Sequence, residues 1–249
     1  MTQIPEKTDT HVPWTDESVL PGWTDSPAPR AVRAPRRLWR PSWLLLGLLG
    51  VLVLVNLHHA FPQYFSLQSS SARIMLKPNL EWHYPLLLVH IFTGNIAMVT
   101  LFFQLWPWLR RNHPSIHRWN GRVYVFAGAI PAALAGLVLV PLRPDPAGSL
   151  GLATMSVLWL FTTAWGWRKA RQRRYVEHRR WMLYSFALAL GTTWGRVIFL
   201  GFTHIEGFTM NISLLIDIAN WFCWVANLLV VQWWLERTAP RAAQIVRRG

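Results

Sequence analysis

Long apolar stretches, separated by short polar connectors, make up the chain from residue 43 onward. A helix needs about 20 mostly apolar residues to cross a bilayer. Six stretches have that character, approximately at residues 43–61, 84–108, 122–142, 150–168, 181–201 and 211–235. We therefore predict an all-α integral membrane protein whose six transmembrane helices occupy residues 43–235.

The two ends of the chain have a different composition. Residues 1–42 are polar and proline-rich, and five arginines stand close before the first apolar stretch. Such a segment has too few apolar residues to bury a core, and its arginines favour the membrane surface. We predict a disordered cytoplasmic tail with a basic juxtamembrane segment over 1–42, and a basic cytoplasmic C-terminal tail over 236–249.

Lysines and arginines are distributed unevenly between the connectors. The tail before the first span holds six, the connectors 110–122 and 168–180 hold four and seven, and the C-terminal end holds four. The connectors on the other side, 62–83, 143–149 and 202–210, hold three together. Because cytoplasmic loops carry the excess of basic residues, we predict that both termini are cytoplasmic.

Composition excludes several classes of protein. Only 14% of residues are charged, against about 25% in soluble domains. The formal net charge of +14 would suggest nucleic acid in a soluble protein, but here its placement reflects membrane topology, so we predict no nucleic-acid partner. The single cysteine, Cys223, excludes an intrachain disulfide and metal sites built from several cysteines.

Polar residues inside the spans recur at helical spacing and form two layers. Such side chains face the interior of a helix bundle in lipid. His117 and His178 stand near the cytoplasmic starts of spans three and five, whereas His90, Arg196 and Asp217 lie five or six residues inside the outer surface. Small residues such as Gly121, Gly128 and Ser185 lie between these layers.

The inner layer has the residues of a haem site. Two histidines at one depth on different helices can ligate haem iron from both sides, and small residues leave room for the macrocycle. Arginines at the same edge can pair with the propionates. This interpretation makes His117 and His178 the iron ligands of a b-type haem between spans three and five, with propionate partners at Arg118, Arg122 and Arg179.

Two other interpretations of the inner layer stay open. The histidines can simply cap the helix starts and contact lipid head groups. A metal site from His113, His117 and Glu177 is also conceivable, but Pro114 opens the helix and aims His113 poorly. We therefore predict no metal other than haem iron.

The outer layer contains Arg196, the residue that is most costly to place in lipid. An arginine in the hydrocarbon region costs at least about 2.5–3.5 kcal/mol unless it is compensated. Asp217 is the only acidic residue in the sequence of any predicted span. The short connector 202–210 makes spans five and six neighbours. We predict an Arg196–Asp217 ion pair with His90 as a hydrogen-bonding third member.

Several of these motifs form a combination that resembles a known family. The residues are a span-two histidine (His90), His-Arg-Trp-x-Gly-Arg-x-Tyr from His117 to Tyr124, His-Arg-x-Trp-Met from His178 to Met182, and the late Arg196. The combination is similar to the bacterial multi-pass membrane family called domain of unknown function 2306. The resemblance covers spans two to five, roughly residues 84–200.

A more distant resemblance is to the ascorbate-linked transmembrane b-type cytochromes. They also have six spans, cytoplasmic ends and a four-helix core of spans two to five. The resemblance implies that His117 and His178 share a cytoplasmic-side haem and that His90 matches a span-two ligand. Span four has no histidine, so this chain departs from the pattern of the outer haem.

These observations leave three functions open. The first is membrane electron transfer through a b-type haem, in the inner (cytoplasmic) membrane of a bacterium. No flavin or nicotinamide fingerprint is present, so a quinone or another redox partner must exchange the electrons. The second is a transporter or a small-molecule or lipid-binding protein that uses the outer polar cluster. The third is a non-catalytic scaffold or assembly subunit.

Overall fold

The computed structural model describes residues 42–60, 62–72, 74–203, 205 and 211–238. The side chains of residues 42, 59, 60, 71, 192, 194, 196–200 and 203 are not part of this description. The tail predicted over 1–42, apart from Ser42, and residues 239–249 of the predicted C-terminal tail therefore lie outside the described residues. The described residues all belong to one compact unit, Pro41–Gly249.

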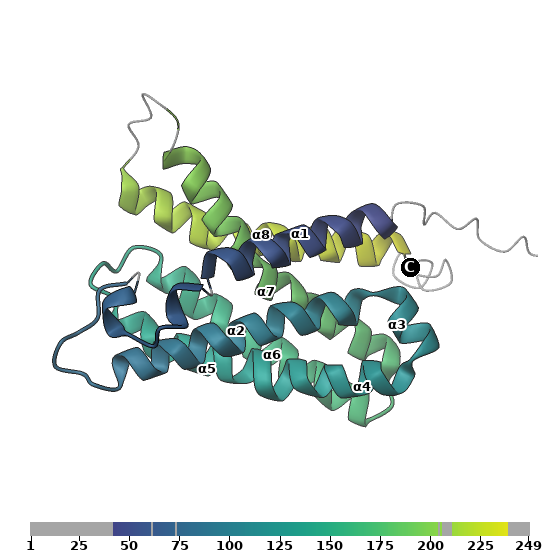
Figure 1. Ribbon diagram of the computed structural model, residues 1–249. Coiled ribbons are helices and arrows are strands. Elements are labelled where there is room, and N and C mark those ends of the chain that lie inside the picture. The colour runs from purple at the N-terminus through teal and green to yellow at the C-terminus, as the bar shows by residue number, and fades with distance from the viewer. Residues whose placement is uncertain (1–41, 61, 73, 204, 206–210, 239–249) are drawn as a thin grey trace, which may run out of the picture. The chain divides into compact units, whose positions relative to one another are not determined.

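Each predicted span corresponds to a helical run (Figure 1). The first two and last three are the α-helices α1 (Ser42–Ala60), α2 (His83–Leu105), α6 (Ser149–Arg171), α7 (Tyr175–Thr203) and α8 (Ile212–Thr238). The third is composite and consists of α4 (Pro114–Arg122), η3 (Val123–Ala129), α5 (Ile130–Leu139) and η4 (Val140–Leu142). Short helices α3 (Pro107–Asn112), η1 (Pro62–Tyr64) and η2 (Ser69–Ser71) lie in the connectors, and the described residues contain no strand.

In the described part of the chain, four helical runs are long and apolar enough to cross a membrane. They are Trp43–Tyr64, His83–Leu105, Pro114–Leu142 and Ile212–Thr238. Helices α6 and α7 have 23 and 29 residues, which is sufficient length, but serine, threonine, glycine and basic residues make them less apolar. The prediction of an all-α fold is thus confirmed, four of the six predicted spans have the length and composition of membrane crossings, and the number of six crossings stays a prediction.

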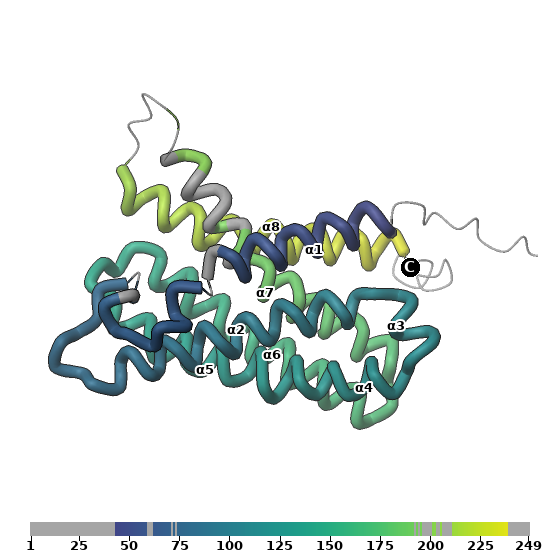
Figure 2. Tube along the Cα trace, viewed as in Figure 1, coloured from purple at the N-terminus to yellow at the C-terminus, as the bar shows by residue number. Residues whose placement is uncertain are grey.

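Two prolines form the corner between α2 and the third span. Trp106 is extended, with φ −71° and ψ 111°, because Pro107 follows it and begins α3. His113 likewise leaves the helical conformation before Pro114, which begins α4. Proline suits the first position of a helix because no intrahelical partner exists there for its missing N–H. Figure 2 shows the chain turning back at this corner.

The third span contains a π-helical segment in place of a simple proline kink. Residues Val123–Ala129 are π-helical, and the N–H of Ile130 bonds to the carbonyl of Val125. Pro131 follows at the start of α5. The irregularity of this span is therefore a widened turn immediately before Pro131, of a kind often found at functional positions.

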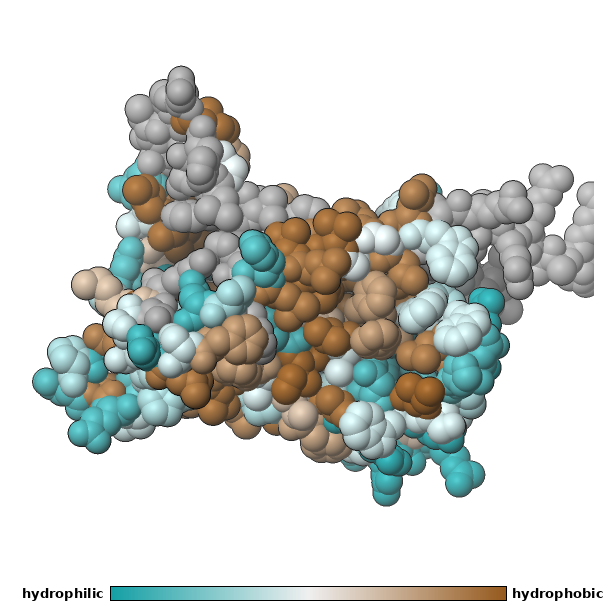
Figure 3. Space-filling view, in the orientation of Figure 1, coloured by the Kyte–Doolittle hydropathy of each residue, from teal (hydrophilic) through white to brown (hydrophobic). Residues whose placement is uncertain are grey.

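The helices pack in chain order. Helix α1 lies on α2, α2 on η3 and α5, α5 on α6, α6 on α7 and α7 on α8, while α2 also reaches α7. The main apolar core draws residues from each of these elements, including Val53, Leu101, Ala132, Leu188 and Trp224. Figure 3 shows the molecular surface from the side seen in Figure 1. Hydrophobic residues gather over its middle, and hydrophilic residues lie toward both ends.

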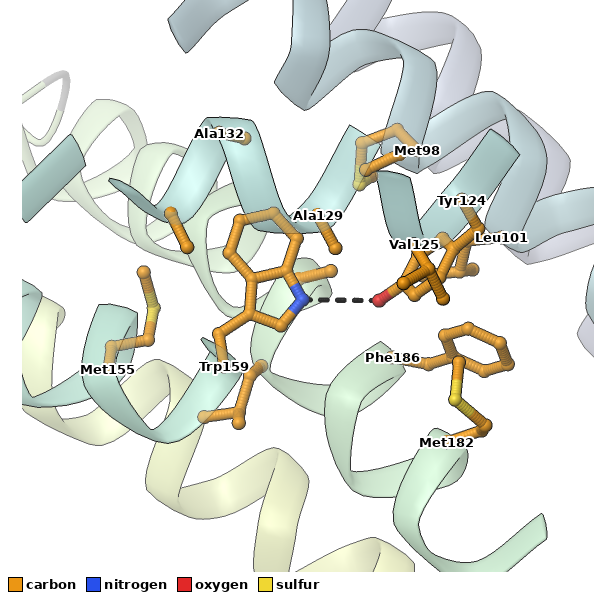
Figure 4. Close-up of a cluster of buried hydrophobic side chains, with 14 of the residues drawn as sticks. Met98, Leu101, Tyr124, Val125, Ala129, Ala132, Met155, Trp159, Met182 and Phe186 are labelled. Carbon is orange, nitrogen blue, oxygen red and sulfur yellow. Dashed lines mark hydrogen bonds between the residues drawn. The ribbon is translucent and has the colours of Figure 1, made fainter. Parts of the chain in front are cut away.

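A hydroxyl network joins three helices at the centre of the bundle. The Tyr124 and Ser185 hydroxyls are 2.7 Å apart, and the Ser185 and Thr163 hydroxyls are also 2.7 Å apart. The indole N–H of Trp159 donates to the Tyr124 oxygen at 3.1 Å, the bond drawn in Figure 4. Tyr124, Ser185 and Thr163 are fully buried. Interhelical hydrogen bonds of this kind hold helices together where lipid offers no hydrophobic driving force.

Close helix packing depends on Gly128. A Cβ at this position would lie 2.9 Å from the Ala97 Cα and 3.0 Å from the Ala97 nitrogen, which are backbone atoms of α2. Gly94 lies one turn away from Ala97 on the same helix, and a Cβ there would meet no atom within 4 Å. The two glycines therefore differ in what a methyl group would meet.

This difference gives a matched pair of substitutions. We expect Gly128→Ala to destabilise the protein by roughly 1–3 kcal/mol, because α2 and η3 must move apart. Gly94→Ala should be neutral or stabilise by up to about 1 kcal/mol, because alanine favours a helix. Thermal unfolding of both variants in the same detergent measures the effect, and equal stabilities would contradict the close-packing argument.

Candidate functional site

His178 is held in one orientation by a neighbouring helix. Its Nδ1 lies 2.8 Å from the carbonyl oxygen of Gly166 in α6. A carbonyl oxygen accepts only, so Nδ1 is the nitrogen that donates its hydrogen. The Nε2 nitrogen of the neutral ring is then the one with a free lone pair. Metal-ligating histidines are typically oriented by such a bond from the other ring nitrogen.

His117 lies at the same end of the bundle. Gln104 of α2 donates from Nε2 to the His117 carbonyl at 2.7 Å and fixes the backbone there. The His117 Nδ1 is buried and has no hydrogen-bond partner among the described residues. Besides its burial, the charges of Arg110, His178 and Arg118 act on this imidazole, so the His178 ring lies within electrostatic range of it.

The arginines around these histidines form a positive cluster. Burial and the charges of Arg179 and Arg111 lower the pKa of Arg110, which lies in α3 outside the spans. Arg118 and Arg122 are exposed, and the Arg179 guanidinium lies 5.1 Å from the Trp234 ring. Among the described residues none of these five arginines has a carboxylate partner. The cluster is therefore suited to an anion.

Glu177, the acidic residue next to His178 in the sequence, is already paired with two cations. Glu177 accepts from Lys169 at 2.8 Å and also pairs with Arg174. The hydrogen bond from Lys169 is the main reason why the pKa of Glu177 is lowered. This arrangement joins the end of α6 to the start of α7. It also shows that Glu177 serves a different pair of cations from the arginines near His117.

The interior side of the two histidines is filled by side chains. A Cβ on Gly166 would lie 2.7 Å from the Met182 sulfur. The Phe186 ring packs edge-on against Tyr124, with centroids 4.9 Å apart (Figure 4). Together with the hydroxyl network, these contacts occupy the region one to two turns deeper than His117 and His178. The small residues predicted to leave room there, such as Ser185, are used for packing.

The outer layer is built around a second fixed histidine. The Nδ1 of His90 donates to the Ala132 carbonyl of α5 at 2.8 Å. A Cβ on Gly136 would lie 3.2 Å from the His90 Cε1 and 3.6 Å from the Ser156 hydroxyl. Gly136 therefore lets the ring lie close to α5, beside α6.

Asp217 has a role that the sequence did not reveal. It was predicted to face the bundle interior, but this is wrong, because the residue is exposed. Its Oδ1 accepts the Gly148 N–H at 2.5 Å. Gly148 has φ +71° and precedes α6, and the Asn220 side-chain amide occupies the place that a Cβ would need. Asp217 and Asn220 thus anchor the connector between α5 and α6 on α8.

The predicted partner of Asp217 cannot be placed. Arg196 belongs to α7, but its side chain lies outside the described part of the chain. The ion pair between Arg196 and Asp217 therefore stays a prediction. The alternative metal site is not assembled, since the part of the chain that is described brings no three His, Cys, Asp or Glu side chains together. His113 instead packs against Trp108, with ring centroids 4.9 Å apart.

Comparison with known proteins identifies the family. A family model described as "Predicted membrane protein (DUF2306)" matches residues 87–235. The chain belongs to this family. The match confirms the predicted resemblance and extends it from about residue 200 to residue 235, so it includes α8. No curated protein and no solved structure matches the chain.

Several site contacts of this DUF2306 protein were missed from sequence. The partners of His178, His90 and Asp217 are all backbone groups, of Gly166, Ala132 and Gly148. A backbone carbonyl or N–H has no residue-type signal. The glycines at 148 and 166 were the available hint, because glycine permits close approach and a positive φ.

The anchor at Gly148 and the predicted ion pair can be separated by substitution. Asp217→Leu should cost about 1–3 kcal/mol, because the connector loses its acceptor. Asp217→Asn keeps an oxygen for the Gly148 N–H, so any loss that remains reports the charge. If Arg196 pairs with Asp217, Arg196→Leu and Asp217→Leu each destabilise, and the double variant recovers much of the loss.

Thermal unfolding in detergent is again the measurement. Additive losses in the double variant would contradict the ion pair. An Asp217→Leu variant as stable as the unchanged protein would contradict the anchor.

Proposed function

We propose that this DUF2306 protein binds a b-type haem at the cytoplasmic end of its bundle and takes part in membrane electron transfer. The observation that supports this most is the state of the two histidines. The Gly166 carbonyl orients His178 so that Nε2 is available, and His117 is a neighbouring, partly buried imidazole whose Nδ1 has no partner among the described residues. Two such imidazoles are the usual axial ligands of a low-spin haem.

The residues around the histidines have distinct tasks in this proposal. Arg118, Arg122 and Arg179, which have no carboxylate partner among the described residues, provide positive charge for the propionates, and we add Arg110, which lies close to Arg179. Gln104 holds the α4 backbone at His117 through its hydrogen bond to the carbonyl. The Gly166 carbonyl keeps His178 in the tautomer whose Nε2 is free. When bound, a haem with two imidazole ligands exchanges single electrons.

The donor set fits a haem, and the packing limits where a macrocycle can lie. Met182 and the Tyr124–Ser185–Thr163 network fill the space on the interior side of the histidines. The proposal therefore requires the macrocycle to lie on the cytoplasmic side of Met182. Electrons would come from a quinone or a protein redox partner, because the chain has no flavin or nicotinamide fingerprint.

A second candidate function is a non-catalytic scaffold or assembly subunit. The closely packed hydroxyl network favours it, since every hydroxyl in that network already has a partner inside the protein. A transporter that uses the outer polar cluster has weaker support, because Asp217 is exposed and its Oδ1 is bonded to Gly148.

Visible spectroscopy separates haem binding from the scaffold. Protein expressed with sufficient haem should give the sharp reduced-minus-oxidised bands of a low-spin b-type cytochrome. His117→Ala and His178→Ala should each abolish these bands. The matched control is His58→Ala, because His58 is an exposed histidine of α1 and its loss should leave the spectrum unchanged. A stable but colourless unchanged protein would contradict the haem proposal.

The proposal includes six crossings of the bacterial cytoplasmic membrane with both termini inside. The excess of lysines and arginines in the termini and in connectors 110–122 and 168–180 supports this orientation. A reporter enzyme that is active only outside the cytoplasm should give no signal when fused after Gly249. The same reporter inserted in the connector 143–149 should be active, and the reverse result would contradict the orientation.

A further inference from the structure

The end of the bundle opposite to His117 and His178 contains a partly enclosed hollow. The connector between α1 and α2 folds over this end, where Tyr64 packs with Leu87 and Leu139 in a small second core. Beside this core lies a hollow of about 170 Å³, formed by the connector, the start of α2 and the end of the third span. Its walls are mostly apolar and include Met75, Leu139 and Leu142.

A buried histidine forms part of the wall of this hollow. His83 lines the hollow and is 1% exposed. The backbone N–H of Lys77 donates to the His83 Nδ1 at 3.1 Å, so in the neutral ring the hydrogen is on Nε2. Among the described residues the His83 ring has this one hydrogen bond, so its Nε2 has no partner there. A buried donor without a protein partner normally bonds to water or to a ligand.

Charged groups lie at the edge of the same hollow. Arg143 is half-buried and has no carboxylate partner among the described residues. Asp145 also lines the hollow, but its Oδ1 already accepts the N–H of Ala147 at 2.9 Å. The opposite charges of Arg143 and Asp145 lie at the edge, and the buried donor of the hollow is His83 Nε2, which favours a ligand with an accepting oxygen.

We propose that this hollow binds a small organic molecule of about one ring in size, through a carbonyl or carboxylate oxygen that accepts from His83 Nε2. The volume supports this size, since a cavity of about 150 Å³ holds one benzene ring. The apolar walls would contact the body of the molecule, and Arg143 would add attraction for a carboxylate. The site is independent of the proposed haem, because none of its residues lies near the inner histidines.

Two probes test the site on the full chain in detergent. Benzoate represents a carboxylate, and duroquinone represents a neutral ring carbonyl. A ligand that binds the folded protein raises its unfolding temperature in a saturable manner. We expect at least one probe to do so. If the ligand is a carboxylate, Arg143→Gln weakens benzoate binding about tenfold or more, whereas duroquinone binding should be little changed by it.

Substitutions locate the binding. His83→Asn keeps an oxygen for the Lys77 N–H but has no atom at the Nε2 position, so binding should weaken about tenfold. Leu142→Trp fills the hollow and should abolish binding. His58→Asn is the control for replacing a histidine and should bind like the unchanged protein. Loss of stability is recognised from the unfolding temperature without probe, and Arg143→Gln gives a test at the half-buried edge, where folding is least affected.

The proposal is overturned in either of two cases. In the first, neither probe raises the unfolding temperature of the unchanged protein. In the second, the rise is the same in His83→Asn and Leu142→Trp as in the unchanged protein, which would place the binding elsewhere.

Discussion

The hydrogen bonds of the Tyr124 hydroxyl determine how the third span, α6 and α7 are aligned. The hydrocarbon core of a membrane has no water to satisfy a polar group. The hydroxyls of Tyr124 and Ser185 and the N–H of Trp159 must therefore find partners inside the bundle. Tyr124, Ser185 and Trp159 meet this condition together. His117 and His178 precede Tyr124 and Ser185 by the same number of residues, about two helical turns. Contact between the deeper pair therefore places the two histidines at one level.

The sequence was sufficient to predict the helices and much of their buried faces, because lipid imposes strong rules on length and polarity. Gly128 and Ser185, which the sequence placed between the two polar layers, are both buried. The same rule failed at Asp217, an exposed residue near the end of its helix. Close to the end of a span a carboxylate can reach a connector, so helical spacing alone does not fix its direction.

The site was predicted less completely than the fold. Residue types showed that His90, His117 and His178 were candidates, but ring orientation depends on carbonyls that every residue has. Whether small residues leave a cavity depends on which side chains pack against them. Gly166 faces Met182 and Gly136 faces His90, so these glycines allow close packing and do not create open space. Such pairing depends on the rotation of each helix, which a single sequence does not specify.

The π-helical turn of η3 has a consequence for how this family can vary in length. A π-turn holds one more residue than the α-turn it replaces, and each residue of an α-helix rotates the chain by about 100°. The turn therefore sets the rotational phase between α4, which carries His117 and Gly121, and α5, which carries Ala132 and Gly136. Losing one residue there would keep the span helical but rotate one half against the other. The polar layers at the two ends of the bundle thus depend on this π-helical turn for their rotation relative to one another.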